Sequence, residues 1–160
     1  MSKNYKLVIY PDKVLTKKCE PVKLPLSEED QELLDAMYNF VKDPENHAVG
    51  LAAPQFGVNK RMFVIRHKRL DGSMFNVKLV NPKIIKNTAK TYIVEDGESC
   101  LSEPGLTLKV ERCKSITLIG YDAITKKNVY IPLNNYLAAV AQHEYDHLEG
   151  ILLTTRKEGK

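Results

Sequence analysis

Two histidines that bracket a glutamate are the residues of this sequence best suited to chemistry. His143 and His147 are four positions apart and Glu144 follows the first of them, which gives the pattern H-E-x-x-H. On an α-helix, residues i and i+4 project from one face about one turn apart, so both imidazoles can bind one divalent metal ion. Glu144 lies beside that face, where its carboxylate can act as a general base on a metal-bound water. The spacing therefore predicts a hydrolytic metal centre.

The segment around this pattern predicts a buried helix. The alternative is a surface helix whose histidines bind nothing, because a pattern with three fixed positions recurs by chance. Residues 134–150, NNYLAAVAQHEYDHLEG, leave few positions for a solvated face, and Asn134 or Asn135 is suited to capping the start. Buried polar side chains need partners, and a metal supplies one to two imidazoles at once. The composition thus favours metal binding.

A metal held by two imidazoles needs at least one more protein ligand, and the sequence offers three cysteines. Cys100 lies in the polar, turn-rich stretch 95–105 and is the best-placed thiol, although the residues alone do not settle its role. Cys19 and Cys113 are expected to fill space in the core. The odd, sparse cysteine count indicates a reducing compartment and argues against a disulfide framework.

A second segment, GLAAPQFG at 50–57, is small and apolar with one polar side chain, Gln55. It is either a tight core strand that ends in a turn, or a strand that aims the Gln55 amide into a site. In the second case the neighbouring backbone could pair with an extended peptide. Both interpretations remain open at this level.

Composition places the chain among ordinary globular proteins. Its 160 residues, 43% apolar and 28% charged, suit one domain with its own core. No apolar run approaches the length of a membrane span, and the N-terminal residues lack the apolar part of a signal peptide. The net charge of +4 arises from basic residues spread along the chain, so nucleic-acid binding is not indicated.

The elements that must position these residues form an α+β pattern, with antiparallel β-sheets packed around the central metal-binding helix. An additional N-terminal helix is expected after Ser27, a good N-cap followed by acidic residues, with its end near Asp43 and a loop at 45–47. Runs of β-branched and aromatic residues predict the strands, at 61–66, 76–85, 91–94, 106–110, 115–121, 128–133 and 151–155.

Three segments together resemble the signature of peptide deformylases: GLAAPQFG at 50–57, ESCLS at 98–102 and QHEYDHLEG at 142–150. Their order and separation match that family over essentially the whole chain. The resemblance implies a single catalytic domain over residues 1–160 with the family's α+β fold. It also implies a metal-dependent hydrolase that removes the N-formyl group from the initiator methionine of nascent polypeptides and releases formate. A cytoplasmic location is expected from the missing signal-peptide and membrane-span patterns.

The resemblance also implies a role for each site residue. The metal ligands would be Cys100, His143 and His147, with a bound water as nucleophile and Glu144 as the general base and acid. The Gln55 side chain and the Leu101 backbone N–H would donate hydrogen bonds to the oxyanion, and the substrate would be bound by Gly50, Leu51 and Gly105. Glu98 would partner a metal-bound histidine, and Arg112 would steady the cysteine loop. One iron(II) ion per chain is implied, with zinc, nickel or cobalt as substitutes, because this ligand set accepts each of them.

The implied partners are formyl-methionyl nascent peptides, with the ribosome surface as a further candidate. DNA and membrane partners are not expected, and the protein is expected to be a monomer. The chain ends ten residues after Gly150, so we expect no long C-terminal helix for ribosome docking.

Two positions depart from the family pattern. Ser99 replaces a glycine beside the cysteine and could add a hydrogen bond there, and Glu103 replaces an apolar residue and could alter the rim of the substrate site. Two alternatives to the deformylase interpretation remain. One is a zinc peptidase, which shares the H-E-x-x-H helix, and the other is a deformylase-like protein that binds metal or peptide without turnover.

Overall fold

A five-stranded antiparallel sheet is the central element of the computed structural model, which describes residues 4–157. The strand order is β1-β2-β3-β8-β9, so β1 and β9 are the edges. The strands are β1 (Gly50–Ala52), β2 (Met62–Lys68), β3 (Met74–Asn87), β8 (Ser115–Asp122) and β9 (Lys127–Asn134). An edge strand has unpaired backbone groups on one side, and β1 is therefore open to a further strand.

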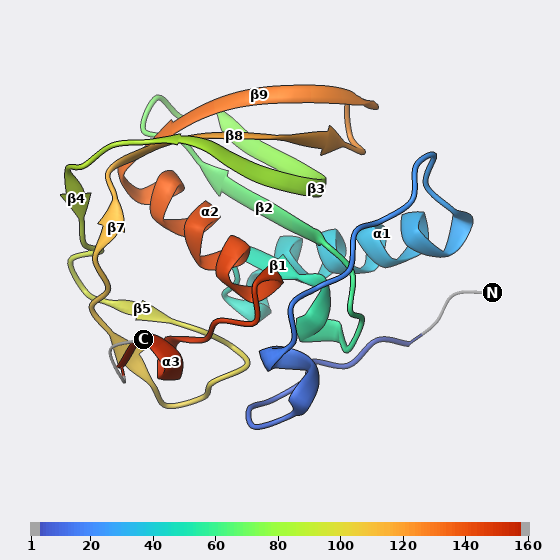
Figure 1. The fold of residues 1–160 in the computed structure, drawn as a ribbon, viewed down its shortest axis with the longest axis horizontal. Coiled ribbons are helices and arrows are strands. Elements are labelled where there is room, and N and C mark those ends of the chain that lie inside the picture. Colours follow the sequence, from blue (N-terminus) through green and yellow to red (C-terminus); the bar gives the residue numbers. More distant parts are fainter. Residues whose placement is uncertain (1–3, 158–160) are drawn as a thin grey trace.

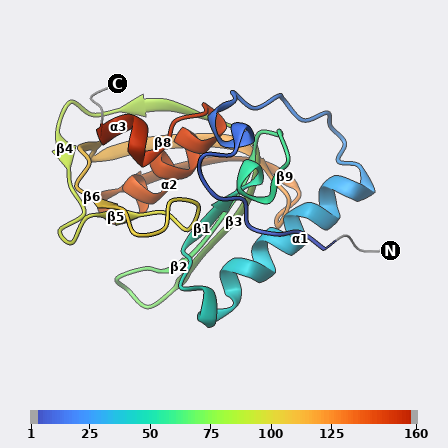
Figure 2. The same cartoon turned by 90° about the horizontal axis from the view of Figure 1, so that it is seen from below.

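Two helices cover opposite faces of this sheet, α1 (Glu28–Lys42) and α2 (Asn135–Leu148). Successive side chains of a strand point to opposite faces, and β2 uses both. Phe63 and Ile65 pack in the cluster that includes α2, whereas Val64 packs in the cluster that includes α1. Figure 2 shows β1, β2 and β3 running between the two helices. This arrangement confirms the predicted α+β fold with a central helix and an additional N-terminal helix.

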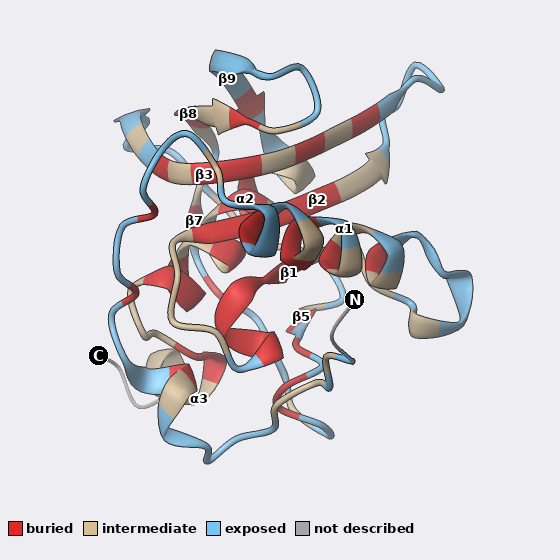
Figure 3. Cartoon of the chain, turned by 90° about the vertical axis from the view of Figure 1, so that its right-hand side faces the viewer, coloured by how far each residue is buried: buried red, intermediate tan, exposed pale blue. Residues whose placement is uncertain are grey.

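Local signals explain how α1 and α2 begin. The Ser27 hydroxyl accepts a hydrogen bond from the Asp30 N–H at 3.0 Å, as expected of an N-cap. Asn134 occupies the N-cap position of α2 without a capping side-chain bond, and the Asn135 N–H is bonded instead to the Lys114 carbonyl. Figure 3 shows buried residues concentrated where α2, β1 and β2 meet, and exposed residues on the outer side of α1. The α2 helix is thus a core element, as its sequence predicts.

The remaining elements outside the main sheet are short, and four of them are strands between β3 and β8. Two small antiparallel sheets pair β4 with β7 and β5 with β6. Their strands are β4 (Thr91–Tyr92), β5 (Glu98–Ser99), β6 (Thr107–Leu108) and β7 (Arg112–Cys113), and three 3₁₀ helices are η1 (Lys13–Thr16), η2 (Pro44–Asn46) and η3 (Ala53–Phe56). The loop expected at 45–47 is therefore largely η2, because the Asp43 side chain caps it at the Glu45 N–H.

The strand predicted at 151–155 is wrong, because this segment leads into a short helix, α3 (Leu153–Lys157). Its β-branched and leucine residues suit a strand locally, but the carboxylate of Glu103 accepts the N–H groups of Leu153 and Thr154 at 2.8 and 3.0 Å. A distant side chain thereby caps the helix start. Among the described helices, none is long and apolar enough to cross a membrane.

Candidate active site

The α2 helix presents both histidines and Glu144 toward the segment that carries Cys100. The imidazole rings of His143 and His147 lie with their centroids 5.2 Å apart, as the i, i+4 spacing requires. Cys100 Sγ lies 3.4 Å from His147 Nε2. The donor atoms of these three residues lie within 4.8 Å of one another, a grouping that could hold one metal ion. The structure therefore brings together the three side chains expected to be ligands.

Glu98 fixes the orientation of His143. Its Oε1 lies 2.9 Å from His143 Nδ1, which must donate because an ionised carboxylate only accepts. Burial opposes the charge on Glu98, but hydrogen bonds from Arg112 and His143 outweigh it and lower the pKa of Glu98 to about 2. With Nδ1 engaged, His143 Nε2 is the nitrogen left for a metal.

Burial disfavours the charged form of both histidines, but hydrogen bonds reverse its effect at His143. It keeps the pKa of His147 well below the ordinary value, so this imidazole is neutral and suited to binding a metal. Burial also disfavours protonated His143, but hydrogen bonds with Cys100 and Glu98 prevail and raise its pKa to about 10. Metal binding at His143 would thus displace a proton.

Glu144, on α2, lies in a tight position against Gly50 of β1. Its Oε1 is buried with no hydrogen-bond partner in the described part of the chain. Burial raises the pKa of Glu144 to about 7, since removal from water disfavours the charged carboxylate. A group that titrates near neutral pH can both accept and return a proton under physiological conditions.

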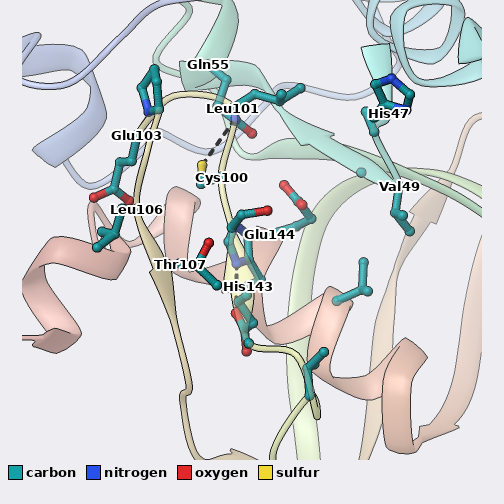
Figure 4. Close-up of a pocket in the computed structure, with 18 of the residues that line it drawn as sticks. His47, Val49, Gln55, Cys100, Leu101, Glu103, Leu106, Thr107, His143 and Glu144 are labelled. Atoms are coloured by element: carbon teal, nitrogen blue, oxygen red, sulfur yellow. Dashed lines mark hydrogen bonds and ion pairs between the residues drawn. The ribbon is translucent and has the colours of Figure 1, made fainter. Parts of the chain in front are cut away.

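Gln55, on η3, holds its amide in a fixed orientation. Its Oε1 accepts the Ala52 N–H at 3.0 Å, and its Nε2 donates to Ser102 Oγ at 3.2 Å and faces Cys100 Sγ at 3.7 Å. Figure 4 shows this amide directed toward the cysteine. Because the oxygen is engaged by β1, only the nitrogen is turned to the site. The segment 50–57 is both a core strand and an amide-presenting turn, so the two interpretations of its sequence are compatible.

A cavity of about 700 Å³ opens in front of these groups. Gln55, Cys100, His143 and Glu144 line it together with apolar side chains, which include Leu7, Ile9, Val49, Leu106 and Val140. Figure 4 shows His47 and Val49 on one side of the cavity and Leu106 on the other. Such a cavity suits a small apolar side chain with a few polar groups at its end.

The residues expected to bind substrate are placed differently from one another. Gly50, Leu101 and Gly105 line the cavity, but the side chain of Leu51 is fully buried in the cluster with α1. Leu51 can therefore meet a substrate only through its backbone on the β1 edge. The Leu101 N–H makes no hydrogen bond with any described residue, so it is free to donate.

Arg112 is buried between two carboxylates, one of which the sequence analysis missed. It donates to both oxygens of Glu98 at 2.9 and 2.7 Å and to Asp146 Oδ2 at 2.6 Å. Arg156, on α3, also donates to both oxygens of Asp146, at 2.7 and 2.8 Å. Asp146 follows His143 by three positions, which could have indicated its place beside the site, but nothing local to Arg156 announces its role.

The two departures from the family pattern have different outcomes. The Ser99 hydroxyl is exposed and makes no hydrogen bond with a described residue, so the hydrogen bond expected near Cys100 is not found. Glu103 lines the cavity, but its side chain is only 4% exposed and its carboxylate is bonded to α3. Glu103 thus lies in the cavity lining, while the contacts of its carboxylate are directed to α3.

Comparisons with known proteins agree on one family. The family model for polypeptide deformylase matches residues 4–160. A peptide deformylase of Shouchella clausii is 40% identical over 160 residues, which cover 91% of this chain and 85% of that protein. One from Fusobacterium nucleatum is 42% identical over 149 residues, which cover 92% and 80%.

Solved structures give the same result. A probable peptide deformylase from Synechococcus phage S-SSM7 superposes with a TM-score of 0.82 at 34% identity and covers 94% of this chain and 98% of its own. The Met-Ala-Ser-bound class I type b peptide deformylase from Acinetobacter baumannii has a TM-score of 0.84 at 28% identity and covers 98% and 99%.

Proposed function

The chain belongs to the polypeptide deformylase family, and we propose that its cavity hydrolyses the N-formyl group of methionyl peptides with the help of one bound metal ion. The observation that carries the proposal is the convergence of Cys100, His143 and His147 beside a cavity. Two of these side chains, Cys100 and His143, line that cavity together with Gln55 and Glu144. Enzymes of this family act on the nascent peptides made during protein synthesis.

The residues present fit a metal ion. One thiol and two imidazoles converge, and burial keeps His147 neutral. Glu98 is hydrogen-bonded to Nδ1 of His143, which leaves Nε2 available for a metal. This donor set accepts iron(II), zinc, nickel or cobalt, and the family resemblance favours one iron(II) per chain. When bound, the metal would supply a Lewis acid for the formyl oxygen and lower the pKa of a water to about 7.

Glu144 is the group that would move protons in this reaction. Its buried Oε1 has no partner among the described residues and its pKa is about 7, so it can take a proton from the attacking water. It would then return that proton to the amine of the departing methionyl peptide. A carboxylate with an ordinary pKa would be a weaker base for the first step, because it holds a proton less tightly.

Gln55 and Leu101 would stabilise the oxygen of the formyl group as it becomes negatively charged. The Gln55 Nε2 is fixed by the bond of its Oε1 to the Ala52 N–H, and the Leu101 N–H is unpaired within the described residues. A donor held in advance toward a developing oxyanion contributes roughly 2.7–4 kcal/mol to transition-state stabilisation.

The open edge of β1 would bind the peptide backbone of the substrate. Gly50 lies at this edge, and a Cβ there would be only 2.8 Å from Glu144 Oε2, so the site leaves no room for a side chain. The Acinetobacter baumannii relative is described as bound to Met-Ala-Ser, a peptide that begins with methionine. We propose the same orientation here, with the methionine side chain in the apolar part of the cavity.

We also propose that residues 1–160 act as one catalytic domain, as a monomer in the cytoplasm. Support comes from the two main hydrophobic clusters, which share β2 and therefore connect both helices to one sheet. Contact with the ribosome surface remains a proposal that gel filtration with and without ribosomes would test.

The experiment that tests the proposed function is formate release from formyl-Met-Ala by protein purified anaerobically with iron(II). The Glu144→Ala variant should retain its metal and lose about 10²–10⁴-fold in kcat, the usual contribution of a general acid–base group. A blocked internal peptide serves as the second substrate. Cleavage of that peptide would indicate a peptidase, and no turnover at full metal content would indicate a binding protein.

A further inference from the structure

The short helix α3 contacts both of the segments that carry the proposed metal ligands. One ligand, Cys100, comes from the segment after β5, and the other two come from α2. The structure has no disulfide within residues 4–157 to fix the distance between these segments. Figure 1 shows α3 beside the chain near β5, after the turn that follows α2.

Glu103 ties the cysteine segment to α3. Its carboxylate accepts the N–H groups of Leu153 and Thr154, at 2.8 and 3.0 Å, and the Thr154 hydroxyl. The Glu103 N–H in turn donates to the Cys100 carbonyl at 2.9 Å. Leu153 is buried and packs in the same hydrophobic cluster as Cys100. Because the Glu103 carboxylate is almost wholly buried, it would be left without partners if α3 moved away.

Arg156 ties α2 to the same helix. Its guanidinium donates to both oxygens of Asp146, which also accepts from Arg112. Arg112 holds Glu98, and Glu98 orients His143. The Arg156 side chain is partly exposed, but it pairs with a nearly buried carboxylate. Moving α3 away would leave the two carboxylates of this network with Arg112 alone, so the network favours the observed position of α3.

We infer that α3 is a clasp that sets the spacing between Cys100 and the two histidines, with Glu103 and Arg156 as its positioning residues. The inference rests on the proposed metal site, and it assigns a use to Glu103, which departs from the family pattern. Neither residue reaches the ligand atoms, so both act through the segments that they hold. The expected consequence is faster metal loss when either contact is removed.

The test measures release of cobalt(II) into excess chelator, followed by the thiolate-to-cobalt absorption band. Glu103→Gln and Arg156→Met should each speed release about tenfold, the lower end of the effect of a residue that supports a ligand. Asp30→Asn is the matched control. Asp30, on α1, is also a buried carboxylate, 5% exposed, and it forms an ion pair with Lys60. The control should lower thermal stability without changing the release rate.

The double variant distinguishes a clasp from two separate contacts. If α3 acts as a unit, either substitution alone displaces the helix and breaks both the Glu103 and the Arg156 contacts. The double variant should then release cobalt no faster than the faster single variant. Release at the wild-type rate in both single variants, or effects that multiply in the double variant, would overturn the clasp. A wild-type protein that shows no thiolate-to-cobalt band would instead overturn the metal site.

A measurement on the unaltered protein covers the case in which the variants fail to fold. Coupling between two sites is reciprocal, so if α3 supports the metal, the metal must support α3. Hydrogen exchange at the Leu153 and Thr154 amides should slow when cobalt(II) binds. Equal exchange rates with and without bound cobalt would contradict the inference.

Discussion

The contact between Gly50 and Glu144 gives the sharpest prediction. A Cβ atom added at Gly50 would lie 2.8 Å from Glu144 Oε2, 3.0 Å from its Cδ and 3.1 Å from its Cγ. Non-bonded carbon atoms prefer about 3.5–4.0 Å, so the carboxylate or the β1 backbone must shift by roughly 0.5–1 Å. Gly50 does not have a left-handed φ, so alanine itself is tolerated by the backbone. The Gly50→Ala variant therefore displaces the proposed base without touching a ligand.

The magnitude follows from this displacement. A misplacement of about 1 Å in a catalytic arrangement costs on the order of 100-fold in rate, which corresponds to about 2.7 kcal/mol of transition-state stabilisation. Overpacking costs roughly 1–3 kcal/mol of stability, and the lower chain entropy of alanine offsets about 0.4–1 kcal/mol of it. We expect kcat/KM for formyl-Met-Ala to fall about 100-fold and the free energy of unfolding to fall by about 1–2 kcal/mol.

A double-mutant cycle with Glu144→Ala isolates the contact. Formate release gives kcat/KM for Gly50→Ala, urea denaturation gives the unfolding free energy in both backgrounds, and metal analysis should show unchanged occupancy. With Glu144 truncated, the added methyl group has space, so Gly50→Ala should no longer destabilise the protein. Wild-type kcat/KM in the single variant, or equal destabilisation in both backgrounds, would refute the reasoning.

Three further predictions concern groups outside the ligand set. Burial raises the pKa of the Cys19 thiol to about 11 from 9.0, so iodoacetamide should modify it about 100-fold more slowly than a free thiol at pH 8, as mass spectrometry can show. The contribution of this raised pKa to the free energy of unfolding is present below pH 9.0 and is lost as the pH rises through about 11. Labelling of Cys19 at pH 8 as fast as that of a free thiol would contradict its burial. Asp122→Ala should lower the free energy of unfolding by about 2–3 kcal/mol with unchanged kcat/KM, because three backbone N–H groups lose their acceptor; an unchanged urea midpoint would refute this. Ser99→Gly should leave kcat/KM and metal content unchanged, because the hydroxyl is exposed and unbonded within the described residues; altered metal content would restore a special role for the serine.

Elements with local signals could be predicted from the sequence. The start of α1 directly after Ser27 is one such case, because the serine side chain caps the helix and acidic residues fill its first turn. The two histidines lie on one face of a buried helix, because periodicity alone fixes that relation. In such cases the interacting groups lie within one or two helical turns, and the sequence contains the whole interaction.

The α3 helix could not be predicted in this way. Residues 151–155 carry a strand-like composition, and the group that caps the helix, Glu103, is fifty positions away. The place of Arg156 beside Asp146 likewise depends on the turn after α2, which brings the two side chains together. Long-range contacts of this kind follow from the packed fold, and local propensity does not contain them.

The charge balance of the site explains why these distant residues matter to its chemistry. Glu98 and Asp146 contribute two carboxylates to the buried network, and Arg112 and Arg156 contribute two guanidinium groups, so the network is neutral by itself. The Cys100 thiolate and the Glu144 carboxylate would then be negative charges beside a divalent metal ion that this network does not neutralise. Removal of Arg156 would leave an extra negative charge beside α2, which disfavours the ionised form of Glu144. The α3 contacts therefore bear on the proton affinity of the proposed base as well as on the positions of the ligands.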